Sequence, residues 1–289
     1  MRRRTGVAAG ASPTRGRTGV AAGASPARER AGVAMLAAVV LFCLVTPVVS
    51  AYDPHLPDLR RALLPPGPAH WLGTDQLGRD LLTRTAAAGR TSLLVALAVT
   101  AITTALGAAL GTAAGLAGGT AERLLRFAAT VALALPGLTL ALALAGALTP
   151  GYGTVLAALV PLGWVSCALV AATATRRAAS ADHVLASRAI GASAGYLLRR
   201  VIGPHIAGTV LTVATADFAR ALIAVTSLSF LGVGLPPPET DWGGMVSEAT
   251  PLLVTAPRLA LVPALALALT GLALALVVDA RHGRPGQEA

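Results

Sequence analysis

Six long apolar runs constrain this chain more than any other feature of its sequence. At a rise of about 1.5 Å per residue, a run of about 20 residues crosses the hydrocarbon core of a bilayer. Only 12% of the residues are charged, whereas soluble domains carry about 25%. The sequence therefore predicts an all-α polytopic membrane protein with six transmembrane helices. The runs cover residues 31–51, 91–119, 127–148, 152–175, 206–234 and 259–278.

The positive charge comes entirely from arginine. The net charge is +10, with 23 Arg and no Lys. A nucleotide-binding P-loop requires a Lys, and so does Schiff-base chemistry. We therefore expect no enzyme activity and no cofactor in this chain, and any ATP hydrolysis belongs on a separate subunit. Aromatic residues make up 3% of the chain, which argues against a nucleic-acid surface.

The N-terminus carries a short repeat. The ten residues RTGVAAGASP occur twice with a period of thirteen. The unit is too short to stack as a solenoid, so we expect residues 1–30 to form a disordered, Arg-rich cytoplasmic tail. Residues 31–51 follow as an uncleaved first transmembrane helix, because this run is longer than the core of a signal peptide. A cleaved signal peptide that ends at VVSA is the alternative for this run. Arg2–Arg4 are compatible with a twin-arginine export signal, but the apolar run begins far downstream of them.

A polar segment, residues 52–87, is expected to form an external loop. Its sequence motif consists of Gly73, Thr74, Asp75, Gly78, Arg79 and Asp80. Thr74 or Asp75 is expected to cap a following helix, and Asp75 can pair with Arg79 four residues later on a solvated surface. Acid–base chemistry or a metal site near a His is the functional alternative.

Residues 88–279 contain the remaining five helices. Gly107, Gly111 and Gly115 recur every four residues, a pattern typical of close helix packing in lipid. Asp217 and Arg220 lie three residues apart within an apolar run, so they share a face and can pair. Ionisable residues at bilayer depth face the bundle interior or a wet cavity. We expect them to line the transport pathway or a subunit interface.

The Arg-rich segment 176–205 separates two apolar runs. Positively charged loops are retained in the cytoplasm, so we place this segment, the N-terminus and the C-terminal tail 280–289 there. That orientation puts 16 of the 23 arginines on the cytoplasmic side. From its residues alone, the segment 176–205 is either a docking surface for a partner or an amphipathic helix that lies on the lipid surface.

Four segments resemble the permease subunits of binding-protein-dependent ABC importers, specifically the C-type subunits of the dipeptide, oligopeptide and nickel group. Residues 70–94 are similar to the HPLGTDxLGRDxxSRxxxGxRxSL segment of that group, with Trp71 in place of Pro. Residues 227–245, SLSFLGVGLPPPETDWGGM, are similar to its SLSFLGLGxxPPxPxWGxM segment. Residues 188–204 resemble its cytoplasmic loop, and residues 256–279 resemble its last span.

The resemblance implies that residues 185–204 couple the permease to an ATPase subunit. The EAA triplet of the family is Leu185-Ala186-Ser187 here, so its Glu is missing, and Gly203 stands where Leu is usual. These departures bear on the strength of the coupling. The implied coupling residues are Leu185, Ala186, Ser187, Arg188, Ala189, Gly191, Ala192, Ser193, Val201 and Pro204.

By this resemblance, the chain has the type I ABC importer permease fold and forms half of a translocation pathway in a prokaryotic plasma membrane. The implied partners are a second permease subunit, two ATP-binding subunits and an extracytoplasmic solute-binding protein. The implied cargo is a di- or oligopeptide, with nickel or another small solute as the alternative. A stand-alone proton-coupled transporter that uses Asp217 is the rival of a different class.

Overall fold

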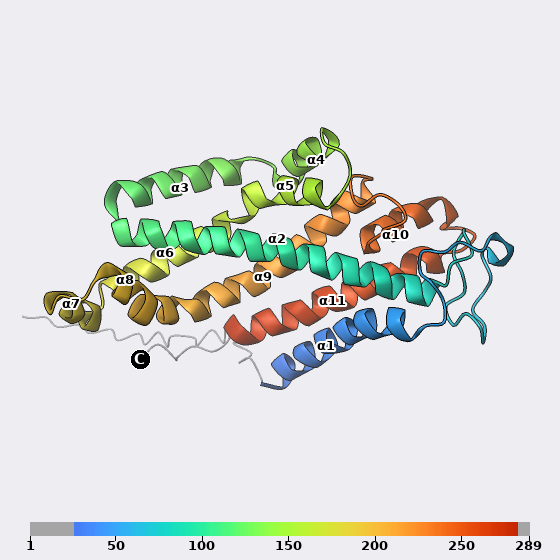
Figure 1. Ribbon diagram of the computed structural model, residues 1–289, viewed down its shortest axis with the longest axis horizontal. Coiled ribbons are helices and arrows are strands. Elements are labelled where there is room, and N and C mark those ends of the chain that lie inside the picture. Colours follow the sequence, from blue (N-terminus) through green and yellow to red (C-terminus); the bar gives the residue numbers. More distant parts are fainter. Residues whose placement is uncertain (1–25, 283–289) are drawn as a thin grey trace, which may run out of the picture.

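The computed structural model describes residues 26–282 as an elongated bundle of helices (Figure 1). No β-strand occurs in this range; there is a single isolated bridge between Thr74 and Asp80. The helical elements are α1 (Pro26–Val49), η1 (Leu59–Arg61), α2 (Leu81–Ala117), α3 (Gly119–Ala134), α4 (Gly137–Gly146), α5 (Tyr152–Gly163), α6 (Val165–Ala179), α7 (Asp182–Ala189), α8 (Ala194–Tyr196), η2 (Leu197–Ile202), α9 (Gly203–Phe230), α10 (Trp242–Ala249), η3 (Thr250–Leu252) and α11 (Arg258–His282).

Five helical segments in the described range are long and apolar enough to cross a membrane, namely α1, α2, α5 with α6, η2 with α9, and α11. The pair α3–α4 counts as a sixth span if its two halves cross together, but it is bent by 79°. The bend lies at Pro136, before which Leu135 takes an extended conformation with ψ of 137°. A proline removes a helical N–H and pushes the preceding residue out of the helical region. The all-α membrane fold is confirmed, with its third span broken.

Several helices begin earlier than the apolar runs suggest, most clearly the first three. Helix α1 starts at Pro26, so residues 26–30 are helical rather than part of a disordered tail. Helix α2 starts at Leu81, inside the segment expected to be a loop, and α3 already starts at Gly119. Hydropathy marks only the part of a helix that lies in the apolar layer, whereas caps and propensity set where the helix begins. The repeat in residues 1–25 and the tail beyond residue 282 lie outside the described residues.

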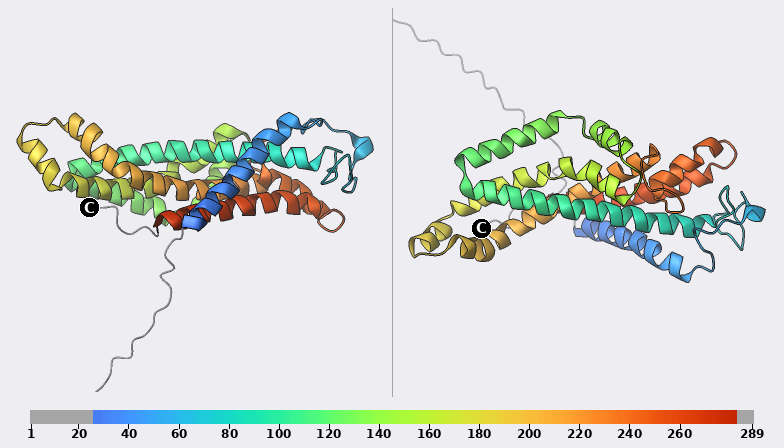
Figure 2. Two further views of the ribbon diagram at one scale, coloured as in Figure 1. Left: turned by 90° about the horizontal axis from the view of Figure 1, so that it is seen from below. Right: turned by 45° about the horizontal axis from the view of Figure 1, so that its top comes forward.

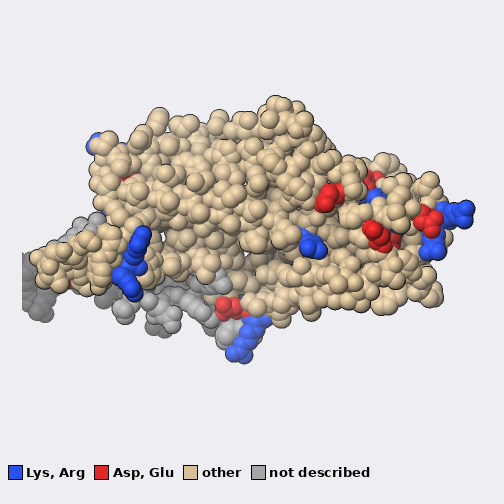
Figure 3. Space-filling model, viewed as in Figure 1, with Lys and Arg blue, Asp and Glu red and all other residues tan. Residues whose placement is uncertain are grey.

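Helix α2 runs along most of the bundle and packs against α1, α6 and α9. Helix α11 pairs with α1 on one side, as all views show, and α3 to α5 lie on the other (Figures 1 and 2). On the face shown in Figure 3, charged side chains gather at the right-hand end, with others at the left-hand end and on the lower edge; apart from a basic side chain right of centre, the broad upper surface between the ends is uncharged. This distribution is the one that a bilayer requires of a spanning bundle.

The predicted glycine stripe forms the contact between α2 and α6. A Cβ atom added at Gly107 would lie 2.5 Å from the carbonyl oxygen of Trp164, and one added at Gly115 would lie 2.6 Å from that of Ala172. Gly111 meets the carbonyl of Ala168 even more closely. The backbones of the two helices therefore touch, which only residues without a Cβ allow.

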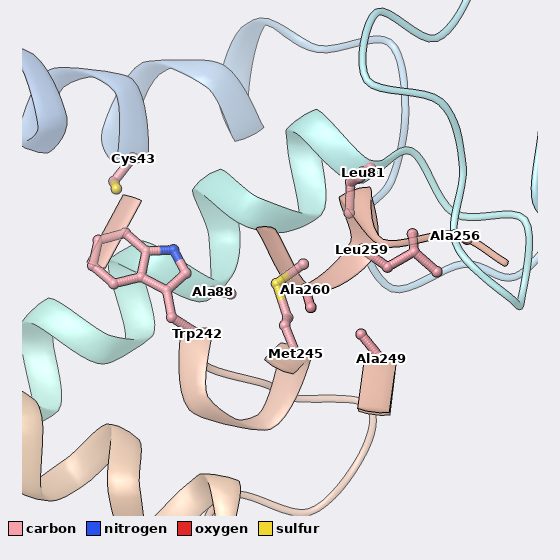
Figure 4. Close-up of a cluster of buried hydrophobic side chains, with 9 residues drawn as sticks. All are labelled: Cys43, Leu81, Ala88, Trp242, Met245, Ala249, Ala256, Leu259 and Ala260. Atoms are coloured by element: carbon pink, nitrogen blue, oxygen red, sulfur yellow. The ribbon is translucent and has the colours of Figure 1, made fainter. Parts of the chain in front are cut away.

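A second contact region joins α1, α2, α10 and α11 (Figure 4). Trp242 is fully buried at its centre and its Nε1 donates a hydrogen bond to the carbonyl of Thr85 at 3.0 Å. The indole packs against Gly89 of α2 and the region includes Cys43. Cys43 and Cys167 are both free and buried, so they pack as small apolar side chains.

The α2–α6 seam yields a stability prediction. A Gly111→Leu substitution should lower the stability of the bundle by about 1–3 kcal/mol or more, because the added side chain forces the two backbones apart. Gly208→Leu is the matched control, since a Cβ at Gly208 meets nothing within 4 Å. Thermal unfolding of the purified variants in detergent measures the difference. Equal melting temperatures for the two variants would contradict the assigned packing.

Candidate functional site

The segment from Gly73 to Asp80 is a compact loop rather than part of a helix. Its two glycines have left-handed backbone conformations, with φ of 79° at Gly73 and 76° at Gly78. A Cβ atom at Gly78 would collide with the backbone carbonyl of Asp58, so no other residue fits there. The isolated bridge between Thr74 and Asp80 closes the loop.

The carboxylate of Asp75 organises this loop. Its Oδ1 accepts hydrogen bonds from the backbone N–H groups of Leu77 at 2.8 Å and Arg79 at 2.9 Å. Its Oδ2 accepts from Arg79 Nε at 2.7 Å and from Arg84 Nη1 at 2.9 Å. The predicted pairing of Asp75 with Arg79 is confirmed. The expectation of a solvated surface is wrong, because Asp75 is only 1% exposed.

A fourth charged residue comes from a distant part of the chain. Arg84 Nη2 donates to Oε2 of Glu248 on α10 at 2.6 Å, and Arg79 Nη2 lies 3.7 Å from the same oxygen. We call Asp75, Arg79, Arg84 and Glu248 the Asp75 cluster. It joins the loop and the start of α2 to α10. No local pattern in the sequence points to Glu248, because 164 residues separate it from Arg84.

Asp80, not Thr74 or Asp75, caps the helix that follows. Its Oδ2 accepts from the backbone N–H of Thr83 at 2.9 Å and from the hydroxyl of Thr83 at 2.8 Å. Its Oδ1 lies 2.9 Å from Nδ1 of His70. Thr74 instead accepts a hydrogen bond from the N–H of Leu64 at 2.8 Å, so it fixes an earlier turn of the loop.

The donors and acceptors of this loop point to a structural role. Among residues 26–282, no group of three or more His, Cys, Asp and Glu side chains is placed to hold a metal ion. Both Asp75 and Asp80 are buried and accept several hydrogen bonds each. These bonds satisfy the carboxylates within the loop, as buried charges require.

A second capped helix start lies beside the cluster. Oδ1 of Asp241 accepts from the N–H of Gly244 at 2.8 Å and so caps α10. Burial raises the pKa of the Asp241 carboxyl above its usual range, and the hydrogen bond from Gly244 opposes that rise. The next residue, Trp242, is the buried centre of the contact region in Figure 4. The segment 227–245 therefore locks α10 against α2.

The Arg-rich segment lies at the opposite end of the molecule, where α7 and α8 protrude (Figure 1). Its anchor is a cluster of buried apolar side chains that includes Val184 of α7, Leu197 and Ile202 of the π-helical segment η2, and Ile206 of α9. Leu116 at the end of α2 packs against the same cluster. The segment is thus fixed to the helix bundle on one face.

The predicted coupling residues are distributed over several elements of this segment. Leu185, Ala186, Ser187, Arg188 and Ala189 belong to α7, Val201 lies in η2, and Pro204 lies in the first turn of α9.

The turn between α7 and α8 depends on a single glycine. Gly191 has φ of 91°, and Ala192 N–H donates to the carbonyl of Ser187 at 3.0 Å. The hydroxyl of Ser193 accepts from the N–H of Tyr196 at 3.3 Å. A positive φ at the end of a helix is the usual role of glycine there, so Gly191 sets the angle between the two short helices.

An ion-pair bridge holds the beginning of the Arg-rich segment to α3. Glu122 Oε2 lies 2.7 Å from Arg176 Nη1 of α6, and Glu122 Oε1 lies 2.7 Å from Arg126 Nη2. No spacing along the chain points to the pairing of Glu122 with Arg176, because the two residues are 54 positions apart.

Asp217 and Arg220 lie on α9 between the two ends. Arg220 Nη2 pairs with Oδ1 of Asp217, so the predicted pairing is confirmed. The Asp217 side chain is 9% exposed and that of Arg220 is 63% exposed. Both line a cavity of about 310 Å³ whose walls come from α2, α4, α5, α6 and α9. The loop motif at Gly73–Asp80, the coupling segment at residues 185–204 and the Asp217–Arg220 pair therefore lie in three separate parts of the structure.

The Asp75 cluster leads to a second prediction. Asp75→Asn should lower the free energy of unfolding by about 3–5 kcal/mol, because it leaves Arg79 and Arg84 buried with a neutral partner. The control is Asp58→Asn, which removes the half-exposed pair with Arg61 and should cost less than about 1 kcal/mol. Chemical denaturation in mild detergent compares the two. A smaller loss for Asp75→Asn than for Asp58→Asn would show that the cluster is not a stabilising unit.

Comparison with known proteins agrees with this architecture. Residues 107–283 match the family model described as "Binding-protein-dependent transport system inner membrane component". This range includes the glycine seam, the Arg-rich segment, the Asp217–Arg220 pair and α11. The Gly73–Asp80 loop lies before it.

Individual relatives cover more of the chain. The oligopeptide transport system permease protein OppC of Bacillus subtilis is 30% identical over 223 residues, which are 77% of this chain and 73% of the relative. A putative peptide transport system permease protein of Brucella suis is 33% identical over 245 residues, 85% of this chain and 82% of the relative. The nickel transport system permease protein NikC of Escherichia coli K12 is 34% identical over 250 residues, 85% and 89% of the two chains. The chain therefore belongs to the family of ABC importer permeases that serve peptide and nickel transport systems.

Proposed function

We propose that this permease forms half of the translocation pathway of an ATP-driven importer and couples to a separate ATPase subunit through residues 185–204. The observation that carries the proposal is the protruding pair of short helices, α7 and α8, which is anchored on one face and exposed on the other. The same bundle carries, at its far end, a rigid loop held by the Asp75 cluster. A partner-binding surface at one end and a rigid loop at the other are features expected of a subunit that transmits motion.

The exposed face of the α7–α8 segment is apolar enough to bind a protein. Leu185 is 49% exposed, Ile190 is 88% exposed and Tyr196 is 56% exposed. Val184 and Leu197 are each close in sequence to one of these residues and are buried in the anchoring cluster. A partner that binds the exposed side chains therefore pushes directly on the ends of α2 and α9, which supports rigid-body transmission of ATPase closure.

We place the Arg-rich segment and both termini in the cytoplasm. Arg176, Arg177, Arg199 and Arg200 all lie at this end of the bundle and are exposed, as the positive-inside rule favours. At the opposite end, Arg79 and Arg84 are buried in ion pairs of the Asp75 cluster. Because these two arginines are held there by ion pairs, their presence on the external side does not argue against a cytoplasmic Arg-rich segment.

The assembly and its cargo follow from the relatives. We propose a second permease subunit, two ATP-binding subunits and an extracytoplasmic solute-binding protein as partners. Two of the three relatives described above carry peptide transport names, so a di- or oligopeptide is the proposed cargo. Nickel is the second candidate, because NikC is 34% identical.

Reconstitution tests the proposed function. The permease is placed in proteoliposomes with the proposed partner permease, ATPase subunits and solute-binding protein, and uptake of a radiolabelled dipeptide is measured. Uptake should require both ATP and the binding protein. Uptake by the permease alone, driven by a proton gradient, would overturn the proposal.

Gly191 offers a test of the coupling segment. Gly191→Leu should leave ATP hydrolysis in the assembled complex while reducing uptake several-fold, because a side chain at φ of 91° strains the backbone by about 1–2 kcal/mol and alters the angle between α7 and α8. Gly208→Leu on α9 adds the same side chain in open space and serves as the control. Normal uptake per ATP hydrolysed in the Gly191→Leu complex would count against the coupling role.

The ion pair on α9 offers a separate test of the pathway. Asp217→Asn and Arg220→Gln should each lower the transport rate at least several-fold, since each leaves an unpaired charge beside the cavity. Size-exclusion chromatography of the complex separates a transport defect from an assembly defect. If both variants assemble and transport at the normal rate, the pair lies outside the pathway and the subunit interface.

A further inference from the structure

Another cavity lies between α6 and α9, near the Arg-rich end of the bundle. Its volume is about 380 Å³, and every residue that lines it belongs to one of these two helices. On α6, the lining residues lie opposite the face of Ala168 and Ala172, which meets the glycines of α2. The cavity is therefore a groove on the side of the two helices that is turned away from α2. We call it the α6–α9 groove.

Two basic side chains from different helices line the end of this groove. Arg177 is in the last turn of α6, and His205 is in the first turn of α9. In the part of the chain that the structure describes, neither side chain forms an ion pair, whereas the neighbouring Arg176 is paired with Glu122. No Asp or Glu is among the described residues that line the groove. The charge of Arg177 is thus left without a carboxylate, and the groove favours an anion.

The groove becomes more apolar toward the middle of the bundle. Thr173 precedes Arg177 by one helical turn, and Thr209 follows His205 by one turn. Leu169 and Val170 line the groove about one turn further along α6. A ligand that matches this order has an anionic group at one end and an apolar part at the other.

The position of the basic pair along the spans indicates where such a ligand comes from. The candidate span that contains α6 ends at Ala179, just after Arg177, so the pair lies at the level of the lipid headgroups. In the orientation proposed above, this end faces the cytoplasm, where the membrane surface is rich in anionic phospholipids. Basic pockets between spanning helices on this side bind anionic headgroups.

We propose that the α6–α9 groove binds an anionic phospholipid, with its phosphate at Arg177 and His205 and an acyl chain against Leu169 and Val170. A guanidinium donates two parallel N–H groups to a phosphate, and an imidazole donates an N–H in either protonation state. The ammonium of a zwitterionic headgroup finds no carboxylate in the groove. The proposal uses the orientation proposed above and is independent of the cargo.

Lipid retention by the assembled complex tests this site. The full-length permease is co-purified with the proposed partner subunits in detergent, stripped of lipid, and titrated with phosphatidylglycerol or phosphatidylcholine of the same acyl chains. Native mass spectrometry counts the lipids bound per permease. One phosphatidylglycerol molecule should bind about ten-fold more tightly than phosphatidylcholine, because only its headgroup carries a net negative charge. Excess inorganic phosphate should not displace it, since free phosphate has no acyl chain.

Four variants assign the bound lipid to the groove. The double substitution Arg177→Gln with His205→Gln should remove the tightly bound phosphatidylglycerol, whereas Arg123→Gln, at an exposed position outside the groove, should retain it. Thr209→Phe fills the groove without changing charge and should also remove the lipid. Leu211→Phe is its control, because Leu211 is exposed and does not line the groove. Co-purification with the partner subunits establishes that each variant is folded.

The outcomes separate this site from the importer function. Equal retention of phosphatidylglycerol by the wild type and the double variant would overturn the lipid site. A wild-type complex that retains no phosphatidylglycerol would overturn it as well and would assign the groove to a subunit interface. Displacement by inorganic phosphate would show an anion site without a lipid. None of these results bears on ATP-driven uptake, which the reconstitution above measures separately.

Discussion

The backbone contact between α2 and α6 is the interaction on which the other helices depend. In lipid, apolar side chains gain little by leaving their surroundings, so helices associate through close packing and hydrogen bonds. The seam at Gly107, Gly111 and Gly115 brings carbonyls of α6 against α2. Helix α2 also contacts α1 and α9, so its position determines theirs.

The two ends of the bundle are held together by different kinds of interaction. At one end, the Asp75 cluster buries charged side chains and satisfies them with one another, which gives a rigid loop joined to α10. At the other end, α7 and α8 bury one apolar face and leave another exposed. The first arrangement holds a shape, and the second leaves a surface available for a partner.

Between these ends, the break at Pro136 shapes one wall of the cavity beside Asp217. Pro136 separates α3 from α4, whereas Trp164 keeps a helical backbone between α5 and α6. Gly137 and Leu138, just after the break, line the cavity together with Asp217 and Arg220. Most of the other lining residues are apolar, so the charged pair is the main polar feature of this region.

The class of the fold follows from the sequence alone, because in a bilayer only helices satisfy the backbone of long apolar runs. So do the local pairings of Asp75 with Arg79 and of Asp217 with Arg220, since both follow from spacing along the chain. The starts of the helices are harder to predict from the sequence, because hydropathy gives no information about capping residues. Asp80, rather than Thr74 or Asp75, caps α2.

Which of these residues are buried, and what they contact, depends on how the helices pack in three dimensions. Glu248 joins the Asp75 cluster from 164 residues away, and Glu122 binds Arg176 across 54 residues. Asp217 on α9 and Leu138 in the first turn of α4 line one cavity although 79 residues separate them along the chain. Contacts of this kind depend on how the helices are arranged in space, and no spacing along the chain encodes them.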